Sequence, residues 1–391
     1  MDFKGRLNMN IGIFIADIEF RTGGSESYFA GLLSALQKMY SQAKFEILTT
    51  CTPKKLRTDE SSLAERLSET YGFHVCSAFK VIRCPIKATN ALTVLRAYRW
   101  MRQYSERFDM LFNCSRNLMT FKAKKNISIM HFPVQSYTAS KTACRMPFLL
   151  PVARRLDEKW KESFDVFLCN SHYTERHLKK IWGIPEKKIS VVYPPVGMVR
   201  SGTLGKKRQI IVCSRIEPSK SLHVLVEAFT RLDSGDVTLA IVGAKLPEDE
   251  AYYQRLVKIA DGYDVVFHFN PSRRELEELY RESLIFWHAK GLETEESLKP
   301  DLLEHFGITT VEAMSAGCIP VVIDKGGQQE IVDEGINGFK WNTTDELLEK
   351  TRAVLANGHS IAMQKAAEEK AQSYNFDTFC MRLENIFGEK K

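Results

Sequence analysis

Short apolar runs alternate with longer stretches of helical spacing along this chain. The apolar run at residues 9–17 predicts a buried strand, and residues 25–40 predict a helix with one apolar face. The loop between them carries Gly23 and Gly24. Strand, glycine loop and helix in this order are typical of the start of a doubly wound α/β fold. The full Gly-x-Gly-x-x-Gly pattern is missing, so a bound dinucleotide is not expected.

The same alternation occurs twice. After further strands at 44–50, 109–114, 127–131 and 165–170, the proline-rich stretch 193–208 predicts a linker, and strands follow at 209–214, 237–243, 265–269, 284–288 and 318–323. A chain of 391 residues is also too long for one ordinary core. We therefore expect two Rossmann-like α/β domains, 1–196 and 197–371. Residues 340–391 are expected to be helical, and the last segment, 372–391, is expected to cross back onto the first domain.

Charge is distributed unevenly between the two halves. The net charge is +7, but residues 1–200 hold 32 Lys and Arg against 17 Asp and Glu, whereas the rest hold 23 against 31. Residues 110–156 contain no acidic side chain. This basic half is either a solvated surface or a face that meets an anionic membrane or a pyrophosphate-linked lipid. No nucleic-acid-binding module is recognisable, so nucleic acid is not expected as a partner.

The helix expected at 91–107 carries four arginines between leucines and aromatic residues. It either lies on a membrane surface or packs as an ordinary helix whose arginines reach past apolar neighbours to water. No apolar run approaches the length of a membrane span, and residues 11–16 lack the features of a signal peptide. The expected location is therefore cytoplasmic, peripheral on the cytosolic or inner face of a membrane.

Metal chemistry is not expected. The nine cysteines are scattered with no Cys-x-x-Cys pair, which favours reduced thiols. No histidine pair has the spacing of a helical metal site, and no Asp-x-Asp triplet is present.

The candidate chemistry is concentrated at residues 300–339. A loop beginning at Glu304 precedes a helix predicted at 310–316, and Thr309 with Glu312 has the spacing of a capping box. The first amides of that helix, together with its dipole, are suited to hold a phosphate. Glu304 and Glu312 lie on either side of the helix start, where both carboxylates are able to face one pocket.

Two cations follow the first strand of the second half. Arg215 and Lys220 lie in Ser-Arg-Ile-Glu-Pro-Ser-Lys, between strand and helix, where they are either a clamp for a diphosphate or a surface pair. Gly243 ends the next strand and leaves room for a nucleotide. In the first half His131 precedes Phe132 and Pro133, so it marks the point where the chain leaves the sheet. A single histidine in such a position is more often structural.

The stretch EHFGITTVEAMSAGCIPVV resembles the Glu-x7-Glu motif of retaining glycosyltransferases of family 4 and group 1, which include dolichol-pathway mannosyltransferases and bacterial polysaccharide-type enzymes. The match includes Gly307, Gly317 and Pro320. The Arg-x4-Lys spacing of Arg215 and Lys220 also resembles that family, as does the stretch FLCNSHYTERHLKKIWGIPEKKISVVYPPV. The resemblance implies the GT-B fold, with two Rossmann-like domains facing each other across a cleft.

The resemblance also implies an activity: metal-independent, retaining transfer of a hexose-type sugar from GDP-mannose or a UDP-sugar to a lipid-linked or polysaccharide acceptor. His131 is then expected near the anomeric carbon and Glu304 on sugar hydroxyls. Glu312 is expected on the ribose unless its role is only capping. The expected donor-binding residues are Gly23, Gly24, Arg215, Lys220, Gly243, Phe306, Gly307, Ile308, Thr309 and Glu312.

Two alternatives stay open. A phosphorylase or nucleotide-sugar epimerase of the same architecture would hydrolyse or epimerise a donor without an acceptor. A catalytically silent sugar- or lipid-binding partner of another transferase would have no need for this intact set of polar residues. The acidic insertion 293–301 departs from the shortest form of the motif and is a candidate gate.

Overall fold

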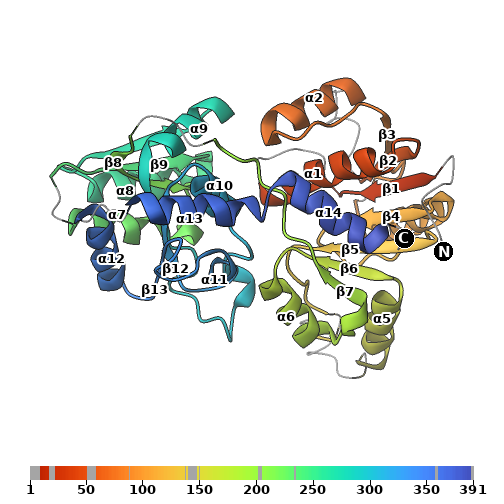
Figure 1. Cartoon of the computed structure of the whole chain (residues 1–391). Coiled ribbons are helices and arrows are strands. Elements are labelled where there is room, and N and C mark those ends of the chain that lie inside the picture. Colours follow the sequence, from red (N-terminus) through yellow and green to blue (C-terminus); the bar gives the residue numbers. More distant parts are fainter. Residues whose placement is uncertain are drawn as a thin grey trace. The chain divides into compact units, whose positions relative to one another are not determined.

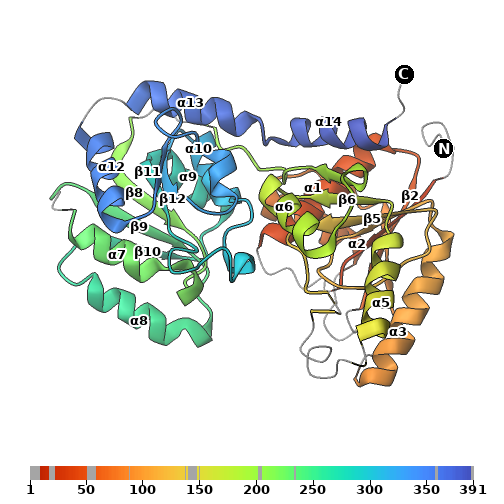
Figure 2. The ribbon, with the colours of Figure 1, turned by 90° about the horizontal axis from the view of Figure 1, so that it is seen from below.

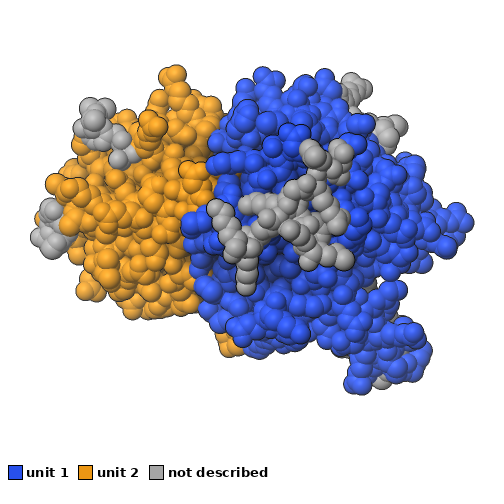
Figure 3. All heavy atoms as spheres, turned by 45° about the vertical axis from the view of Figure 1, so that its right-hand side comes forward, with its two compact units in different colours: residues 1–195, 379–391 blue, residues 196–378 orange. Residues whose placement is uncertain are grey.

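The structure, a computed structural model, consists of two compact units. It describes residues 9–16, 23–50, 59–87, 89–136, 138–139, 148, 150–200, 205–232, 235–356 and 360–388. Unit 1 comprises Met1–Pro195 and Phe379–Lys391, and unit 2 comprises Val196–Thr378 (Figure 3). Each unit is built on its own parallel sheet.

Unit 1 contains a seven-stranded parallel sheet in the order β3-β2-β1-β4-β5-β6-β7 (Figure 1). Its strands are β1 (Asn10–Phe14), β2 (Lys44–Thr49), β3 (Phe79–Arg83), β4 (Met110–Asn113), β5 (Lys125–Met130), β6 (Val166–Cys169) and β7 (Ile189–Val191). In the centre Ile13 pairs with Ile47 on one side and with Phe112 on the other. The strands are short and apolar, as expected for a sheet covered on both faces.

Helices cover both faces of this sheet. They are α1 (Gly24–Met39), α2 (Glu60–Tyr71), α3 (Ala91–Tyr104), α5 (Leu150–Glu162) and α6 (His172–Trp182), with 3-10 turns at Ser105–Arg107 and Glu186–Lys188. Side chains of α3 and α5 belong to one core cluster under the sheet, and Figure 2 shows both helices on the same side. The α3 and α5 helices therefore turn their outer faces to the same side of the unit.

The C-terminal helix α14 (Phe376–Phe387) packs on unit 1 from residue 379 onward. The Phe379 ring meets the Tyr28 ring edge-on, with centroids 5.5 Å apart, and the Phe387 ring lies 5.6 Å from that of Phe112. The hydroxyl of Tyr40 donates to the carbonyl oxygen of Phe387 at 3.3 Å. Aromatic packing thus fixes this last helix on the α1 side of the sheet.

Unit 2 contains a six-stranded parallel sheet in the order β10-β9-β8-β11-β12-β13. Its strands are β8 (Lys207–Cys213), β9 (Thr238–Gly243), β10 (Val265–Phe269), β11 (Ser283–His288), β12 (Ile319–Ile323) and β13 (Phe339–Trp341). In both sheets the strand order reverses at the centre, between β1 and β4 in unit 1 and between β8 and β11 in unit 2. In doubly wound folds, ligands bind outside the carboxyl ends of the strands at such a point.

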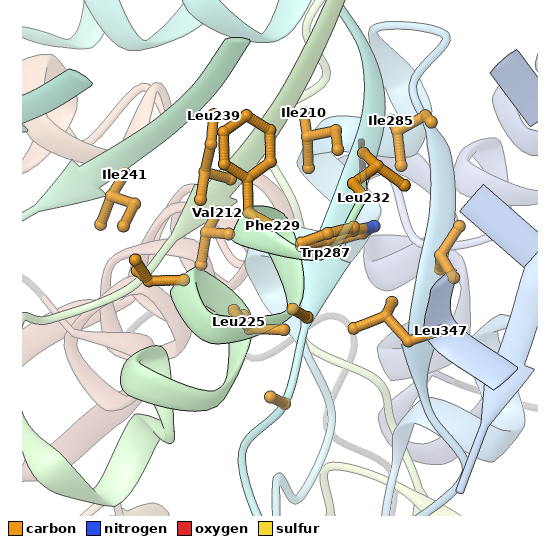
Figure 4. Close-up of a cluster of buried hydrophobic side chains, with 14 of the residues drawn as sticks. Ile210, Val212, Leu225, Phe229, Leu232, Leu239, Ile241, Ile285, Trp287 and Leu347 are labelled. Atoms are coloured by element: carbon orange, nitrogen blue, oxygen red, sulfur yellow. The ribbon is translucent and has the colours of Figure 1, made fainter. Parts of the chain in front are cut away.

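The helices of unit 2 are α7 (Leu222–Thr230), α8 (Glu250–Ile259), α9 (Arg273–Glu282), α10 (Ile308–Ser315), α11 (Gln328–Ile331), α12 (Thr344–Ala356) and α13 (Ser360–Gln372). Short 3-10 turns occur at Pro218–Lys220, Pro247–Asp249 and Pro300–Leu302. One core cluster joins β8, β9 and β11 to α7 and α12, and Figure 4 shows Trp287 among Phe229, Leu232 and Leu347. The indole nitrogen of Trp287 donates to Thr351 at 3.0 Å, so this large ring is buried with its polar group satisfied.

The predicted linker, 193–208, forms no helix or strand at 193–200, and its last two residues begin β8. Its first part is fixed to unit 2. The Val196 amide donates to the carbonyl oxygen of Tyr374 at 2.9 Å, and the Val199 amide donates to the Ser315 hydroxyl, also at 2.9 Å. Both valine side chains are 1% exposed. This part of the chain is therefore irregular, as a linker is expected to be, and residues far along the sequence hold it in place.

The segment after residue 340 was expected to be helical throughout, which is wrong at its start. Residues Phe339–Trp341 form strand β13, which pairs with Val321–Ile323 of β12. A three-residue strand gives almost no periodic signal in the sequence. Its existence depends on the neighbouring strand.

Candidate active site

Four ionisable side chains meet at the carboxyl ends of the two central strands of unit 2. Lys220 follows β8, His288 is the last residue of β11, and Lys290 comes two residues later. Glu304 comes from the loop that precedes α10. This is the point where the strand order reverses, so the fold itself places these groups where a ligand is expected.

All three basic groups face the same oxygen of Glu304. The distances to its Oε2 are 3.5 Å from the Nζ of Lys220, 3.4 Å from the Nζ of Lys290 and 3.8 Å from the Nε2 of His288. The exposed fraction of these side chains is between 9% for His288 and 23% for Glu304. The group is thus a compact cluster of charges that is largely removed from water.

Each of these groups changes the pKa of its neighbours. Burial alone would raise the pKa of Glu304, but Lys290, Lys220 and His288 outweigh burial and hold that pKa well below its usual value. Burial lowers the pKa of Lys220, and Glu304 opposes this effect. Burial also lowers the pKa of His288. Near neutral pH the cluster therefore holds an ionised carboxylate and an uncharged imidazole.

Main-chain contacts fix the loop that carries Glu304. The amide of Gly327 donates to the Glu304 carbonyl oxygen at 2.7 Å. A Cβ on Gly326 would lie 2.3 Å from that same oxygen, so the two loops approach as closely as only glycine permits. Lys325 donates to the carbonyl oxygens of Gly291, Leu292 and Thr294 and so fixes the chain after β11, where the acidic insertion begins.

The start of α10 differs from the prediction. The helix comprises Ile308–Ser315, and its N-cap is Gly307, with φ +123° and no side-chain cap hydrogen bond. Thr309 lies inside the first turn, so the predicted Thr309–Glu312 capping box is wrong. A glycine in a backbone conformation that other residues rarely adopt starts the helix earlier. The first amides of the helix, at Ile308 and Thr309, therefore directly follow the Glu304 loop.

Glu312 is part of a buried network within unit 2. Its Oε1 is bound by Arg273, and its Oε2 accepts from the hydroxyl of Tyr280 at 3.3 Å. Arg273 also donates to Glu277 at 2.8 Å and to the carbonyl oxygen of Gly197 at 3.2 Å. The Glu312 side chain thus has strong partners already. Sequence reasoning missed Arg273, since a pair 39 residues apart leaves no local pattern.

Of the other predicted donor-binding residues in unit 2, three have clear local contacts. The Arg215 guanidinium is 54% exposed and pairs with Glu217 at 3.1 Å, outside the tight cluster that contains Lys220. The ring of Phe306 is buried against Tyr374, with centroids 5.2 Å apart. A Cβ on Gly243 would lie 1.9 Å from the Ser214 carbonyl oxygen, so close packing of two strand ends explains this glycine.

The predicted residues of unit 1 lie at the carboxyl ends of β1 and β5. Gly23 is the N-cap of α1 and Gly24 its first residue, and both are exposed. His131 directly follows β5, and its carbonyl oxygen accepts from the Thr174 hydroxyl at 3.1 Å. Ser171 caps α6, since its side chain accepts a hydrogen bond from the Thr174 amide.

The imidazole of His131 has an apolar environment. Its ring meets Tyr28 edge-on, with centroids 5.3 Å apart, and its Nε2 is buried without a hydrogen-bond partner among the described residues. Burial, and to a smaller extent the charge of Arg116, together lower its pKa to about 4. The ring is therefore uncharged near neutral pH. Its unpartnered nitrogen is the feature of unit 1 that is most suited to contact a ligand.

Within the described residues, no three His, Cys, Asp or Glu side chains gather in a way that would hold a metal ion. Positive charge at the candidate site comes from lysines.

Comparison with solved structures identifies the class of fold. The structure of Anabaena HepE in complex with UDP and glucose superimposes with a TM-score of 0.70 over 97% of this chain and 99% of that chain, at 17% identity. At this identity the likeness concerns the fold alone. The fold is that of the GT-B glycosyltransferases, as the sequence predicts.

The sequence comparisons give the family. Residues 22–199 match Glycosyltransferase Family 4, and residues 198–374 match Glycosyl transferases group 1. The two matches are adjacent and together extend through both units. The chain therefore belongs to this family of glycosyltransferases. The predicted resemblance is thereby confirmed, and the chain is an enzyme of the transferase class.

Curated relatives include mannosyltransferases. A Neurospora crassa protein named GDP-Man:Man(3)GlcNAc(2)-PP-Dol alpha-1,2-mannosyltransferase is 28% identical over 56% of this chain and 44% of its own length. An alpha-1,3/1,6-mannosyltransferase from Dictyostelium discoideum is 23% identical over 87% of this chain and 88% of its own length. The chain thus matches less than half of the first relative and most of the second.

Proposed function

We propose that this enzyme transfers a mannosyl or other hexosyl group from a nucleoside-diphosphate sugar to a glycan carried on a lipid pyrophosphate. The observation that carries the proposal is the lysine-rich cluster around Glu304 at the central strand ends of unit 2. The name of the Neurospora crassa relative favours GDP-mannose as the donor, and that of the Dictyostelium discoideum relative favours a mannosyl group. Because the solved HepE structure is a complex with UDP, a UDP-sugar is the alternative donor.

The proposed chemistry follows from where charge develops. Breaking the bond between sugar and diphosphate leaves negative charge on the diphosphate, which Lys220 and the amides of Ile308 and Thr309 would stabilise. Positive charge develops on the sugar ring, near the ionised carboxylate of Glu304. Groups that are already fixed and shielded from water stabilise such charges more strongly than solvent does.

His131 is assigned a neutral role. An uncharged imidazole donates or accepts one hydrogen bond without adding charge, which suits a sugar hydroxyl better than a phosphate. We propose that its buried Nε2 forms a hydrogen bond with a hydroxyl group of the transferred sugar. Retention of the anomeric configuration and independence of metal ions are parts of the same proposal, and both are directly measurable.

The first experiment measures donor binding. Thermal unfolding of the full chain is recorded with GDP-mannose, UDP-glucose and ADP-glucose, because a ligand that binds only the folded state raises the apparent stability by mass action. We expect a rise with GDP-mannose and a smaller one with the others. If none of the three nucleotide sugars changes the unfolding temperature, the proposed donor class is wrong.

The second experiment measures transfer. The full chain is incubated with GDP-mannose and a synthetic lipid-pyrophosphate oligosaccharide, with and without EDTA, and the anomeric configuration of the product is read by NMR. We expect transfer that retains configuration and persists in EDTA. Glu304→Ala should abolish it, while Glu349→Ala, an exposed carboxylate on α12, should not. Release of free mannose or an epimerised donor without acceptor would favour the alternative activities.

We further propose that unit 1 contacts an anionic membrane, where such an acceptor would lie. No helix among the described residues has the length and apolar character needed to cross a bilayer. On α3, Leu92 and Leu95 are 58% and 64% exposed, and Arg96 and Arg99 are exposed beside them. These four positions follow helical spacing and form one outward stripe of leucine and arginine.

A second stripe of the same kind begins just before α5. Phe148, Val152 and Leu156 repeat at intervals of four, and the first of them is 75% exposed. Arg155 and Lys159 lie on the same side of the helix and are also exposed. Figure 2 shows α3 and α5 on the same side of unit 1. Because the residues of both stripes are exposed, both stripes belong to this side of the unit. Apolar side chains between cations fit an anionic lipid surface.

Liposome flotation tests this contact. Vesicles of phosphatidylcholine, with and without phosphatidylserine, are mixed with the full chain at low and at high salt. We expect flotation with phosphatidylserine that decreases at high salt, because salt screens exposed charges. The double variant Leu95→Ser with Phe148→Ser should lose it, and Ile336→Ser, an exposed apolar residue of unit 2, should not. Equal flotation of all three proteins would remove this surface from the proposal.

A further inference from the structure

The cluster around Glu304 contains two side chains that neither motif of the sequence includes. His288 and Lys290 lie at the end of β11, outside both the Glu-x7-Glu stretch and the Arg-x4-Lys stretch. Lys290 lies as close to Glu304 as Lys220 does, His288 lies 3.8 Å from it, and the Lys290 side chain is 17% exposed. They are therefore built into the site and need an explanation of their own.

The charges of the cluster do not balance. Two lysines face one carboxylate, and His288 is uncharged near neutral pH because burial lowers its pKa. The two largely buried ammonium groups pair with the same carboxylate. One negative charge does not fully offset the free-energy cost of removing two positive charges from water. The cluster as a whole is therefore suited to receive an additional anion.

His288 provides a second, independent observation. Its Nε2 faces Glu304, while its Nδ1 is buried and has no hydrogen-bond partner among the described residues. Buried polar nitrogens are nearly always satisfied in folded proteins. This nitrogen is accordingly open to a ligand or to a water molecule that comes with a ligand.

We propose that Lys290 is a second diphosphate-binding lysine, and that Glu304 occupies both lysines until the diphosphate of the donor replaces it. This inference rests on the proposed function, because it concerns the same donor. Without donor, the carboxylate of Glu304 is the counter-ion of Lys220 and Lys290. With donor, the phosphate oxygens take over the two ammonium groups.

The exchange has a consequence for the sugar. Once the lysines bind phosphate, the Oε2 of Glu304 is free to accept a hydrogen bond from a sugar hydroxyl. His288 is the positioning residue in this step, because its Nε2 faces the Oε2 of Glu304. Binding of the diphosphate thus also frees Glu304 to bind the sugar.

Binding of nucleotides to single variants tests the role of Lys290. Affinities of UDP, GDP, UMP and GMP are measured by calorimetry for the wild type, Lys290→Met and Lys258→Met, the last an exposed lysine of α8. Hydrogen bonds to charged groups typically contribute enough for a loss of about tenfold or more. We expect Lys290→Met to lose that much for the diphosphate, to lose less for the monophosphate, and to recover with Lys290→Arg. Unchanged preference for diphosphate in Lys290→Met would overturn the proposal.

A second variant tests the exchange by the sign of its effect. Glu304→Gln removes the competing charge but keeps the shape, so we expect it to bind the preferred nucleoside diphosphate more tightly than the wild type while losing transfer. Circular dichroism and thermal unfolding confirm that each variant is folded. Weaker or equal binding by folded Glu304→Gln would show that Glu304 does not hold the place of the diphosphate.

The outcomes separate this inference from the proposed function. A wild-type protein that binds neither UDP nor GDP contradicts both. A wild-type protein that binds and transfers, with Lys290→Met indistinguishable from it, contradicts only the role of Lys290. Tighter binding by Glu304→Gln together with weaker binding by Lys290→Met supports the exchange.

Discussion

The two sheets reverse their strand order in the same way, but the candidate residues at their carboxyl edges differ in charge. In unit 2, Lys220, Lys290 and Glu304 form a partly buried charged cluster. In unit 1, the candidate is His131 at the end of β5, which is uncharged near neutral pH, is set against the ring of Tyr28 and is influenced by the charge of Arg116. The topology thus determines where a ligand is expected to bind, and the residues at the strand ends determine its charge.

The first prediction concerns the charged edge and has the largest expected effect. Lys220→Met should lower kcat/KM for sugar transfer by about 10²- to 10³-fold, the usual cost of removing one fixed group that stabilises charge in the transition state. Steady-state kinetics measures this effect. The control is Lys258→Met, which removes an exposed lysine of the same unit and should leave transfer unchanged. A loss below about threefold in Lys220→Met would mean that the charged edge is not where the donor diphosphate is stabilised.

The second prediction separates a structural charge pair from the candidate site within unit 2. Arg273→Met leaves the buried carboxylate of Glu312 without its main cationic partner, and such changes typically cost about 3–5 kcal/mol of unfolding free energy. Urea unfolding measures this free energy. Arg274→Met, which alters an exposed arginine beside it, is the matched control. If Arg273→Met costs no more than Arg274→Met, the pair has little structural value and Glu312 is held mainly for a ligand.

Much of the fold was predictable from the sequence. Apolar runs such as those that form β8 and β12 are buried on both faces, so local composition alone indicates them. The Ser171 cap also follows from neighbouring residues. By contrast, β13 exists only because β12 lies beside it, and the linker is fixed by Tyr374 and Ser315 from far along the chain. Local patterns do not contain such contacts.

The candidate site was predictable to a similar extent. Lys220 and Glu304 lie in motifs, and the structure brings them within 3.5 Å of each other. Lys290 lies outside the motifs and is recognisable only once β8 and β11 are neighbours. The start of α10 was misread because a threonine followed by a glutamate looks like a cap, whereas the positive φ of Gly307 cannot be seen in a sequence.

The third prediction concerns the uncharged histidine at the edge of unit 1. The pKa of His131 is about 4 in the folded chain, below its ordinary value of about 6.5. Between these values the unfolded chain binds a proton that the folded chain does not, so stability should fall as the pH is lowered from about 6.5 towards 4. The expected slope from this one group is at most about 1.4 kcal/mol per pH unit. Urea unfolding across this pH range measures it.

His131→Gln provides the comparison for that slope. The variant should lack this share of the pH dependence, while His74→Gln, with an exposed histidine, should keep it. If the wild type and His131→Gln lose stability in parallel, His131 is protonated in the folded chain. The contrast between the charged cluster of unit 2 and the uncharged histidine of unit 1 would then no longer hold.

The smallest expected effect compares how the two edges start their helices. In unit 1 the Ser171 side chain accepts from the Thr174 amide at the start of α6, whereas in unit 2 the backbone of Gly307 begins α10 without a side-chain cap. Ser171→Ala should cost about 1 kcal/mol of unfolding free energy, and Ser171→Gly only a few tenths, since glycine tolerates the N-cap position. Urea unfolding of the two variants measures the difference. If alanine and glycine are equally costly, packing around the buried Ser171, and not its hydrogen bond, holds this edge of unit 1 together.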